Sequence, residues 1–350
     1  MRRFIFAGIS LPFTVIALAI AGCNQPTQPR TATRPVSLTG LTMGTIQYIV
    51  KLDRLPDGIA VKTLQAAIDE RLELVNDQMS TYRPESEISR FNRSESTDWF
   101  EVSSDTAGVV AEALRVSRLS NGAFDATVGP LVDLWNFGPK PGEFKIPSDE
   151  AISESRQRVG FKQIEVRISP PALRKQRPDV RLDLSAIAKG FAVDQIADYL
   201  ELNSVAGYLV EIGGEMRTKG TKPDRTRWTV GIEAPTENER VAQKTIQLGD
   251  RAIATSGDYR QFFDRDGHRY SHTIDPRTGR PVEHSLTSVS VIANNCTFAD
   301  ALATAIMVLG PERGYDFAVK QKLAVLFILR RDAAFVEKST PLFQSLFESD

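Results

Sequence analysis

Apolar residues in the segment 61–79 fall three or four positions apart, which is the spacing that lines one face of an amphipathic helix. These residues are Leu64, Ile68, Leu72, Val75 and Met79. A second helix is predicted over 104–120, begun by a Ser or Asp cap and ended by Asn121 and Gly122. A third helix is predicted over 298–310.

Two segments have mixed patterns. The segment 180–200 looks like a strand that runs into a helix, with Ser185 as the predicted N-cap. The inner face of that helix would hold Ile187, Phe191, Ile196 and Leu200. The segment 122–138, "GAFDATVGPLVDLWNFG", is neither helical in period nor alternating, and its apolar content predicts an ordered, buried loop.

Short β-rich runs make up much of the remaining chain, and several contain glycines typical of bulges or tight turns. These runs are 208–220, 228–235, 251–259, 286–294 and 323–329. Gly213 and Gly214 are predicted to mark a tight bend or a bulge. Helices and strands intermix without a regular β-α repeat, so the pattern predicts an α+β fold: one large mixed domain with mostly antiparallel short strands.

Composition restricts the possible partners. The chain of 350 residues is 41% hydrophobic, which is ample for a large core. Its 43 basic and 44 acidic residues give a net charge of -1. A net charge this close to zero gives no positive electrostatic field that would attract a polyanion, so we expect no nucleic-acid partner.

The N-terminus has the pattern of an exported lipoprotein. Arg2 and Arg3 precede an apolar run that ends in "IAGC" at Cys23, which resembles a bacterial lipobox. We therefore expect a signal peptide over 1–22, fatty acyl chains such as palmitate on Cys23, a flexible tether over 23–37 and a folded domain over 38–350. The expected location is the periplasm, with the anchor in the inner membrane.

All three histidines, His268, His272 and His284, lie within seventeen positions. Histidine is a common metal ligand and proton carrier, so the group suggests a metal or acid/base site. The alternative is a polar loop, because "IDPRTGRP" is rich in turn formers. Spacings of four and twelve on a Pro/Gly-rich loop match no usual zinc pattern. The histidines alone leave both interpretations open.

Asp300 and Thr304 are four residues apart in a predicted helix, so they share one face. A carboxylate and a hydroxyl suit Mg²⁺, which prefers oxygen ligands. The alternative is that Asp300 lies in a first helical turn and interacts with the helix dipole. The common dinucleotide, P-loop, CxxC and HExxH motifs are absent from the sequence.

Eight blocks, in order and spacing, resemble the ApbE-type FAD:protein FMN transferases, formerly called thiamine biosynthesis lipoproteins. The blocks are "TMGT" at 42–45, "STY" with "SEISRFN", "GAFDATVGPLVDLW", "LDLSAIAKGFAVD", "VEIGGE", "AIATSGDY", "YSHTIDPRTGRPV" and "ADALATAIMVLG". The resemblance spans about 38–329 and includes the lipobox.

This resemblance implies a Mg²⁺-dependent enzyme that cleaves the pyrophosphate of FAD, its substrate, and attaches FMN to a threonine of a target protein, releasing AMP. The implied acceptors are subunits of redox-driven membrane ion pumps. A flavin cleft between sub-lobes of the domain is also implied. Two alternatives keep every block: a periplasmic flavin-binding lipoprotein, and an FAD pyrophosphatase without a protein acceptor.

The resemblance also implies site residues. Flavin contacts would come from Met43, Tyr82, Ala123, Phe124, Asp125, Asp183, Lys189 and the segment around Ile274. The metal would bind the carbonyl of Ala186 and the side chains of Asp300 and Thr304.

Two catalytic tasks remain. Lys189 would neutralise charge during phosphoryl transfer. The acceptor hydroxyl needs a base. We choose His272 for that role, with Asp258 or Asp275 as alternatives.

Overall fold

A computed structural model describes residues 35–138, 145–236, 241–259, 262–265, 267–331 and 334–347. The predicted signal peptide, Cys23 and most of the predicted tether lie outside these residues. Residues 34–350 make one compact unit.

The centre of this unit is a sheet of eight antiparallel strands in the order β1-β2-β6-β7-β10-β15-β16-β17. The strands are β1 (Val36–Thr42), β2 (Ile46–Leu52), β6 (Tyr208–Ile212), β7 (Glu215–Lys219), β10 (Ala252–Gly257), β15 (Leu286–Ala293), β16 (Ala324–Arg331) and β17 (Ala334–Ser339). Long helical segments separate several of the strands along the chain, so helices and strands are mixed and the predicted α+β class is confirmed.

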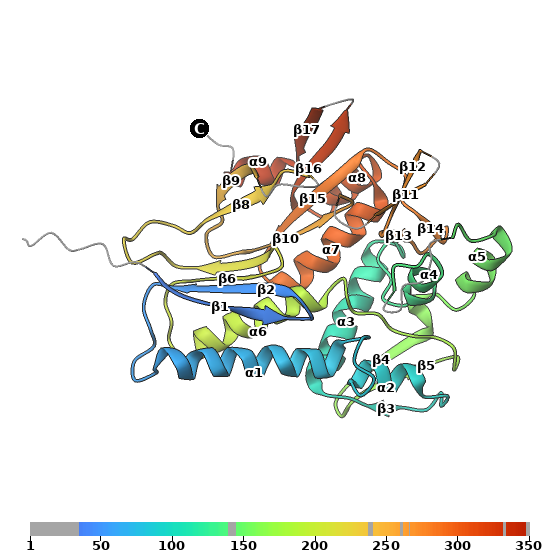
Figure 1. The fold of residues 1–350 in the computed structure, drawn as a ribbon, viewed down its shortest axis with the longest axis horizontal. Helices are drawn as coiled ribbons and strands as arrows, with labels where there is room; N and C mark the ends of the chain where they lie inside the picture. Colours follow the sequence, from blue (N-terminus) through green and yellow to red (C-terminus); the bar gives the residue numbers. More distant parts are fainter. Residues whose placement is uncertain are drawn as a thin grey trace, which may run out of the picture. The chain divides into compact units, whose positions relative to one another are not determined.

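Helices cover one face of the sheet and share the main hydrophobic core with it (Figure 1). They are α1 (Val61–Met79), α3 (Ser104–Leu119), α6 (Ala188–Leu202), α7 (Cys296–Leu309) and α8 (Arg313–Lys320). Helix α7 is apolar on nearly all sides because it packs against the sheet, α3, α6 and α8 at once. The sequence predicted α1 with its bounds, and it predicted α3 and α7 to within a few residues.

The opposite face of the sheet carries a second, smaller core. Strands β8 (Thr229–Glu233) and β9 (Ala242–Gln247) and helix α9 (Pro341–Phe347) cover it. Trp228 and Phe343 are the largest side chains that fill it. The inner strands β6, β10, β15 and β16 therefore bury side chains on both faces of the sheet.

The remaining elements surround the end of the sheet where α3 lies (Figure 1). Helix α2 (Glu87–Arg93) adjoins a three-stranded sheet of β3 (Phe100–Glu101), β5 (Pro171–Lys175) and β4 (Ile164–Ile168), preceded by the 3₁₀ turn η1 (Phe161–Gln163). Two hairpins are β11 (Phe262–Arg265) with β12 (His268–Ser271), and β13 (Ile274–Asp275) with β14 (Arg280–Pro281). Helices α4 (Gly129–Leu134) and α5 (Asp149–Arg156) pack on each other.

Two local predictions were wrong. The alternating residues before α6 form no strand, because the side chain of Asn92 binds both backbone groups of Leu182, at 2.7 and 2.8 Å. Ser185 does not cap α6: Ile187 holds the cap position, and the Ser185 hydroxyl donates to Asp183 instead. In addition, the buried segment 122–138 contains the short helix α4 as well as loop.

A buried carboxylate joins α6 to the start of α7. Asp194 accepts hydrogen bonds from the backbone N–H of Cys296 at 2.9 Å and of Thr297 at 2.8 Å. Arg217 donates to the same carboxylate at 3.0 Å. This carboxylate satisfies two N–H groups that the first turn of α7 leaves without helical partners.

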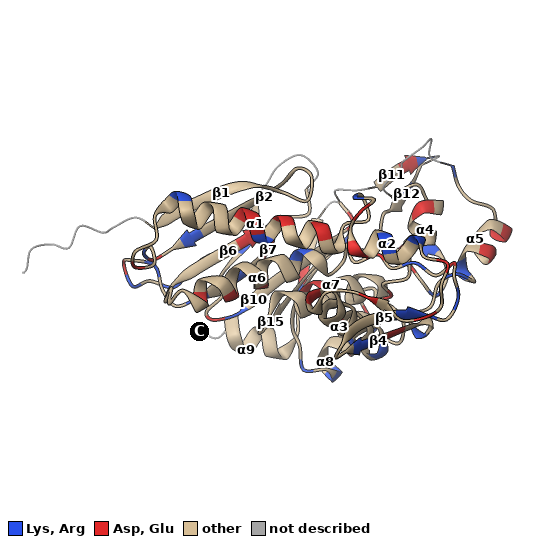
Figure 2. Ribbon diagram, turned by 90° about the horizontal axis from the view of Figure 1, so that it is seen from below, with Lys and Arg blue, Asp and Glu red and all other residues tan. Residues whose placement is uncertain are grey.

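Charge is spread over the described elements, with acidic and basic residues interspersed (Figure 2). Among these elements, none of the helices combines the length and the apolarity that crossing a bilayer requires.

Candidate active site

Three strand ends meet at one end of the central sheet. Strand β2 pairs with β6, and the backbone N–H of Gly213 donates to Gln47 at 3.3 Å, so the β1–β2 turn with Met43 lies beside the β6–β7 turn. Gly213 and Gly214 have φ values of 61° and 103°, which confirms the predicted bend. The C-terminal end of β10 lies at the same end, because β10 runs antiparallel to β7.

A lysine and two buried carboxylates lie next to these turns. Lys189, from the first turn of α6, places its Nζ 2.6 Å from Oε1 of Glu215 and 3.6 Å from Oδ1 of Asp300. Glu215 is only 2% exposed and Asp300 only 3%. Burial raises the pKa of Glu215 to about 7, and the Lys189 ammonium opposes this rise. Burial lowers the pKa of Lys189, but the two carboxylates outweigh it and raise that pKa, so Lys189 stays charged.

Asp300 lies in the second turn of α7, so the alternative that it interacts with the helix dipole was wrong. The helix begins at Cys296 because the Asn295 side chain caps it by accepting from the backbone N–H of Phe298 at 2.9 Å. The Oδ2 atom of Asp300 accepts a hydrogen bond from the N–H of Gly190 at 2.9 Å. This bond fixes the carboxylate against α6.

The other two predicted metal ligands lie nearby in the fold. Thr304 is one turn further along α7, and its Oγ1 is 3.3 Å from Oγ of Ser256 on β10. Ala186 precedes α6 by two residues. Together with Asp300, these residues offer oxygen atoms only, which is the donor set that Mg²⁺ prefers. No cluster of three or more His, Cys, Asp or Glu side chains suited to a metal occurs among the described residues.

Because Gly190 has no side chain, α6 can approach Asp300 and the start of α7 closely. A Cβ at this position would lie 2.3 Å from the carbonyl oxygen of Cys296 and 2.8 Å from Cβ of Asp300. We expect Gly190→Ala to lower the free energy of unfolding by about 3 kcal/mol through overpacking, as measured by urea denaturation. The control is Gly108→Ala in α3, where nothing lies within 4 Å and alanine should stabilise the helix by about 1 kcal/mol. Equal stability of the two variants would contradict the tight contact.

A second group of predicted flavin residues forms around Asp183. Its backbone N–H donates to the carbonyl of Ala126 at 2.7 Å, which ties it to the 123–127 loop. Tyr82 is 68% exposed. Partial burial of its hydroxyl and the charges of Asp183 and Asp133 raise the pKa of Tyr82, so these groups share one region. Tyr82, Asp183 and the 123–127 loop therefore lie together.

Within that loop the side chains already have partners. Asp125 is buried, and its two oxygens accept from the N–H groups of Thr127 and Phe161, both at 2.8 Å. Ala123 and Phe124 are buried. We therefore expect any flavin contact from these three residues to come from backbone atoms, while the Asp125 carboxylate holds the loop in shape.

The aromatic residues after this loop fill a small core. Trp135 stacks on Tyr270 with a centroid distance of 5.9 Å, and its Nε1–H donates to Gly279 at 2.8 Å. Ile274 belongs to the same core. Phe137 lies edge-on to His272, with ring centroids 6.3 Å apart.

The three histidines have different surroundings. His268 is exposed on β12. His284 donates through Nε2 to the carbonyl of Met307 at 2.7 Å, and burial lowers its pKa, so it stabilises the end of α7 as a neutral ring. His272 lies between β12 and β13, beside Phe137.

The two alternative bases differ in their availability. Asp275 is bound through both oxygens to the guanidinium of Arg277, at 2.8 and 2.7 Å. Asp258 follows β10, and its buried Oδ1 has no hydrogen-bond partner among the described residues. Burial raises the pKa of Asp258 to about 6, against the charges of Arg330 and Arg269. Asp258 is thus the better alternative to His272.

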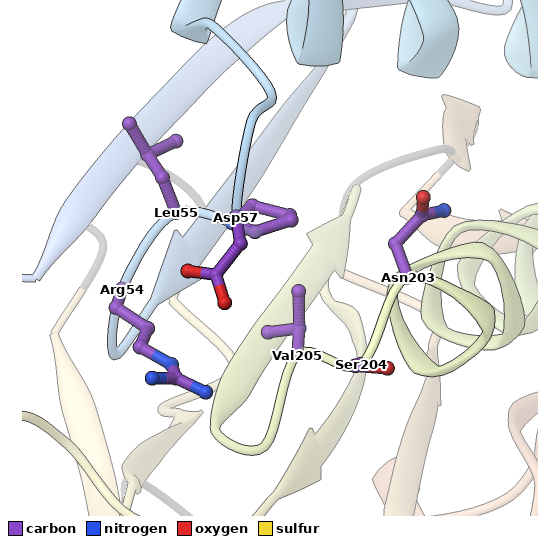
Figure 3. Close-up of a pocket in the computed structure, with 7 residues that line it drawn as sticks. Arg54, Leu55, Asp57, Asn203, Ser204 and Val205 are labelled. Atoms are coloured by element: carbon purple, nitrogen blue, oxygen red, sulfur yellow. The ribbon is translucent and has the colours of Figure 1, made fainter.

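A separate pocket lies at the other end of β2 and α6 (Figure 3). Its volume is about 260 Å³, and its lining includes Arg54, Asp57 and Asn203. Since β2 runs away from the Met43 turn and Asn203 follows the last residue of α6, this pocket is remote from the candidate site.

Sequence reasoning assigned no role to Glu215, Ser256 or Gly190. Glu215 stood inside the "VEIGGE" block, where an acidic residue directly after two glycines was the available signal. The contacts of Gly190 and Ser256 join segments far apart in the chain, and no local pattern indicates them.

Comparisons with known proteins identify the family of this chain. The model of the ApbE family matches residues 42–327. The FAD:protein FMN transferase of Vibrio cholerae is 45% identical over 344 residues, which cover 98% of each chain.

Solved structures give the same result. The flavin transferase ApbE from Vibrio cholerae has a TM-score of 0.82 and 46% identity, covering 89% of this chain and 99% of its own. The apo form of the flavinyl transferase ApbE from Pseudomonas stutzeri has a TM-score of 0.83 and 40% identity, covering 91% and 98%. With a family model over most of its length and relatives at this identity, the chain belongs to the ApbE family.

Proposed function

We propose that this chain is an FAD:protein FMN transferase that requires Mg²⁺ and modifies a threonine of its acceptor. The observation that carries the proposal is the buried Asp300 carboxylate, held against α6 beside the Lys189 ammonium and one turn from Thr304. The names of the relatives support the reaction class.

The metal would be held by Asp300, Thr304 and the carbonyl of Ala186. These oxygen donors fit Mg²⁺, and Oε2 of Glu215 nearby is a buried oxygen without a hydrogen-bond partner among the described residues. When bound, Mg²⁺ would neutralise charge on the pyrophosphate of FAD.

The chain's own residues would supply the remaining functions. Lys189 stays protonated and so presents a positive charge to the phosphates. Met43, Tyr82, Asp183, Ile274 and the 123–125 loop would hold FAD. His272 would take the proton of the acceptor threonine, with Asp258 as the alternative base.

The acceptors would be subunits of redox-driven membrane ion pumps. The enzyme would work in the periplasm, attached to the inner membrane through Cys23. The lipobox-like "IAGC" after an apolar run supports the anchor, and a tethered enzyme would meet membrane-bound acceptors at high effective concentration.

We expect Cys23→Ser to prevent acylation, because serine lacks the thiol that carries the lipid. Intact mass spectrometry of membrane-extracted protein should find the acyl mass and the loss of 1–22 in the wild type alone. Wild-type protein that retains 1–22 and carries no lipid would refute the anchor.

The reaction itself is tested by incubating the protein with FAD, Mg²⁺ and a candidate acceptor. We expect the intact mass of the acceptor to rise by one FMN group, and an acceptor with its threonine replaced by alanine to stay unchanged. Release of FMN and AMP without a mass change on any acceptor would identify an FAD pyrophosphatase instead.

A further inference from the structure

We propose that Glu215 is a positioning residue: it holds the Lys189 ammonium away from Asp300, so that one oxygen of Asp300 stays available to a divalent cation. This inference rests on the metal role proposed above for Asp300. It explains how a buried carboxylate can bind a cation although a lysine ammonium lies beside it.

The distances show which carboxylate binds the ammonium. Hydrogen bonds from an ammonium to a carboxylate are about 2.7–2.9 Å long. Nζ of Lys189 is 2.6 Å from Oε1 of Glu215, but 3.6 Å from Oδ1 of Asp300. Glu215 therefore forms the hydrogen bond, and Asp300 interacts with Lys189 only through the longer charge contact.

Asp300 has one oxygen to spare. Its Oδ2 accepts from the N–H of Gly190 at 2.9 Å, so Oδ1 is the oxygen that a cation could use. This is also the oxygen nearest to Lys189. A direct ion pair between Lys189 and Oδ1 would neutralise the carboxylate and place a positive charge where the cation binds.

The backbone fixes Glu215 in this role. It is the first residue of β7, directly after the bend at Gly213 and Gly214, and it is buried. A Cβ on Gly213 would lie 3.7 Å from Cδ of Lys189 and 3.8 Å from Oε2 of Glu215. The lysine side chain thus passes over the bend to reach Glu215.

Without the Glu215 charge, the nearest anionic partner of Lys189 among the residues around it is Asp300. We expect Glu215→Gln, which keeps the shape of the side chain, to let the ammonium move onto Oδ1. A charge beside a binding group changes its affinity for a cation by about tenfold or more. Mg²⁺ affinity should fall by that factor.

The test is a set of Mg²⁺ titrations by isothermal calorimetry on protein without FAD, at about pH 8, above the pKa of about 7 of Glu215. The variants are Glu215→Gln, Lys189→Met and the double variant. Glu215→Gln should bind about tenfold more weakly, and Lys189→Met at least as tightly as wild type. The double variant should return to the wild-type affinity, because the competing ammonium is gone.

The double variant distinguishes the proposal from its rivals. If it binds as weakly as Glu215→Gln, Glu215 is a metal ligand or a structural residue, and the proposal is wrong. Removing both partners of a buried ion pair is often tolerated, so the double variant should fold even if Glu215→Gln does not.

The proposal can also fail independently of the enzyme's function. Wild-type protein that binds no Mg²⁺ in the titration would overturn it, whatever the transfer assay gives. If the affinities follow the expected order but no acceptor gains FMN, the positioning role stands and the proposed function fails.

Discussion

Replacing Asp300 with asparagine is expected to slow Mg²⁺-dependent FMN transfer on the order of 10³-fold. Asparagine can still accept the hydrogen bond from Gly190, which is 2.9 Å long in the wild type, but it offers the metal no negative charge. Metal ions contribute several kilocalories per mole of charge stabilisation in such reactions. Each 1.4 kcal/mol corresponds to about tenfold in rate. The measurement is the initial rate of acceptor flavinylation across a Mg²⁺ titration.

Thr304→Ala is the matched control for this change. It removes a neutral ligand one turn away on the same helix, so its effect should be milder than that of Asp300→Asn. Both variants should keep the wild-type circular dichroism spectrum. If Asp300→Asn follows the wild-type Mg²⁺ titration curve, Asp300 has only the structural role of holding α7 to α6.

His272→Asn should slow transfer by about 10² to 10⁴-fold, the usual contribution of a general base, while FAD affinity stays close to normal. A base for the acceptor hydroxyl matters to the transfer step but not to holding FAD. Single-turnover transfer and FAD binding by flavin fluorescence measure the two effects separately. His268→Asn, at an exposed position, should change neither.

The pH dependence separates His272 from Asp258. Burial raises the pKa of Asp258 to about 6. A base acts only when deprotonated, so the rate should rise with pH through the pKa of whichever group serves as the base. The rise of the transfer rate with pH should be lost in His272→Asn and retained in Asp258→Asn.

The opposite result would assign the base to Asp258. Loss of FAD binding in His272→Asn would instead make His272 a flavin or structural contact. His284→Asn is less suitable as a control, because His284 donates to the carbonyl of Met307 at 2.7 Å and its loss should lower stability.

Local patterns predicted those parts of the fold that local forces determine. Helix α1 was predicted with its bounds because its apolar stripe is buried in the main hydrophobic core over its whole length. Val180, Leu182 and Leu184 alternate as in a strand, and all three are buried. The segment is nevertheless no strand, because a side chain, Asn92, replaces the neighbouring strand as hydrogen-bond partner.

Sequence motifs and spacing predicted only part of the candidate site. Helical spacing indicated Asp300 and Thr304, the family resemblance added Lys189, and the structure brings Lys189 and Asp300 to 3.6 Å. The hydrogen bond of Lys189 to Glu215 joins residues 26 positions apart. That of Gly190 to Asp300 joins residues 110 positions apart. Contacts between such distant positions depend on the complete fold, so periodicity and spacing cannot indicate them.

The cap that Asp194 places on α7 makes the site's opening measurable by deuterium exchange. The amide hydrogens of Cys296 and Thr297 bind the Asp194 carboxylate of α6, so they exchange only when the two helices separate. Asp300 lies one turn further on and binds α6 through Gly190, so the same separation breaks its contact. The protection of these two amides from exchange therefore reports how often the Asp300 carboxylate loses its contact with α6, and the measurement needs no substrate.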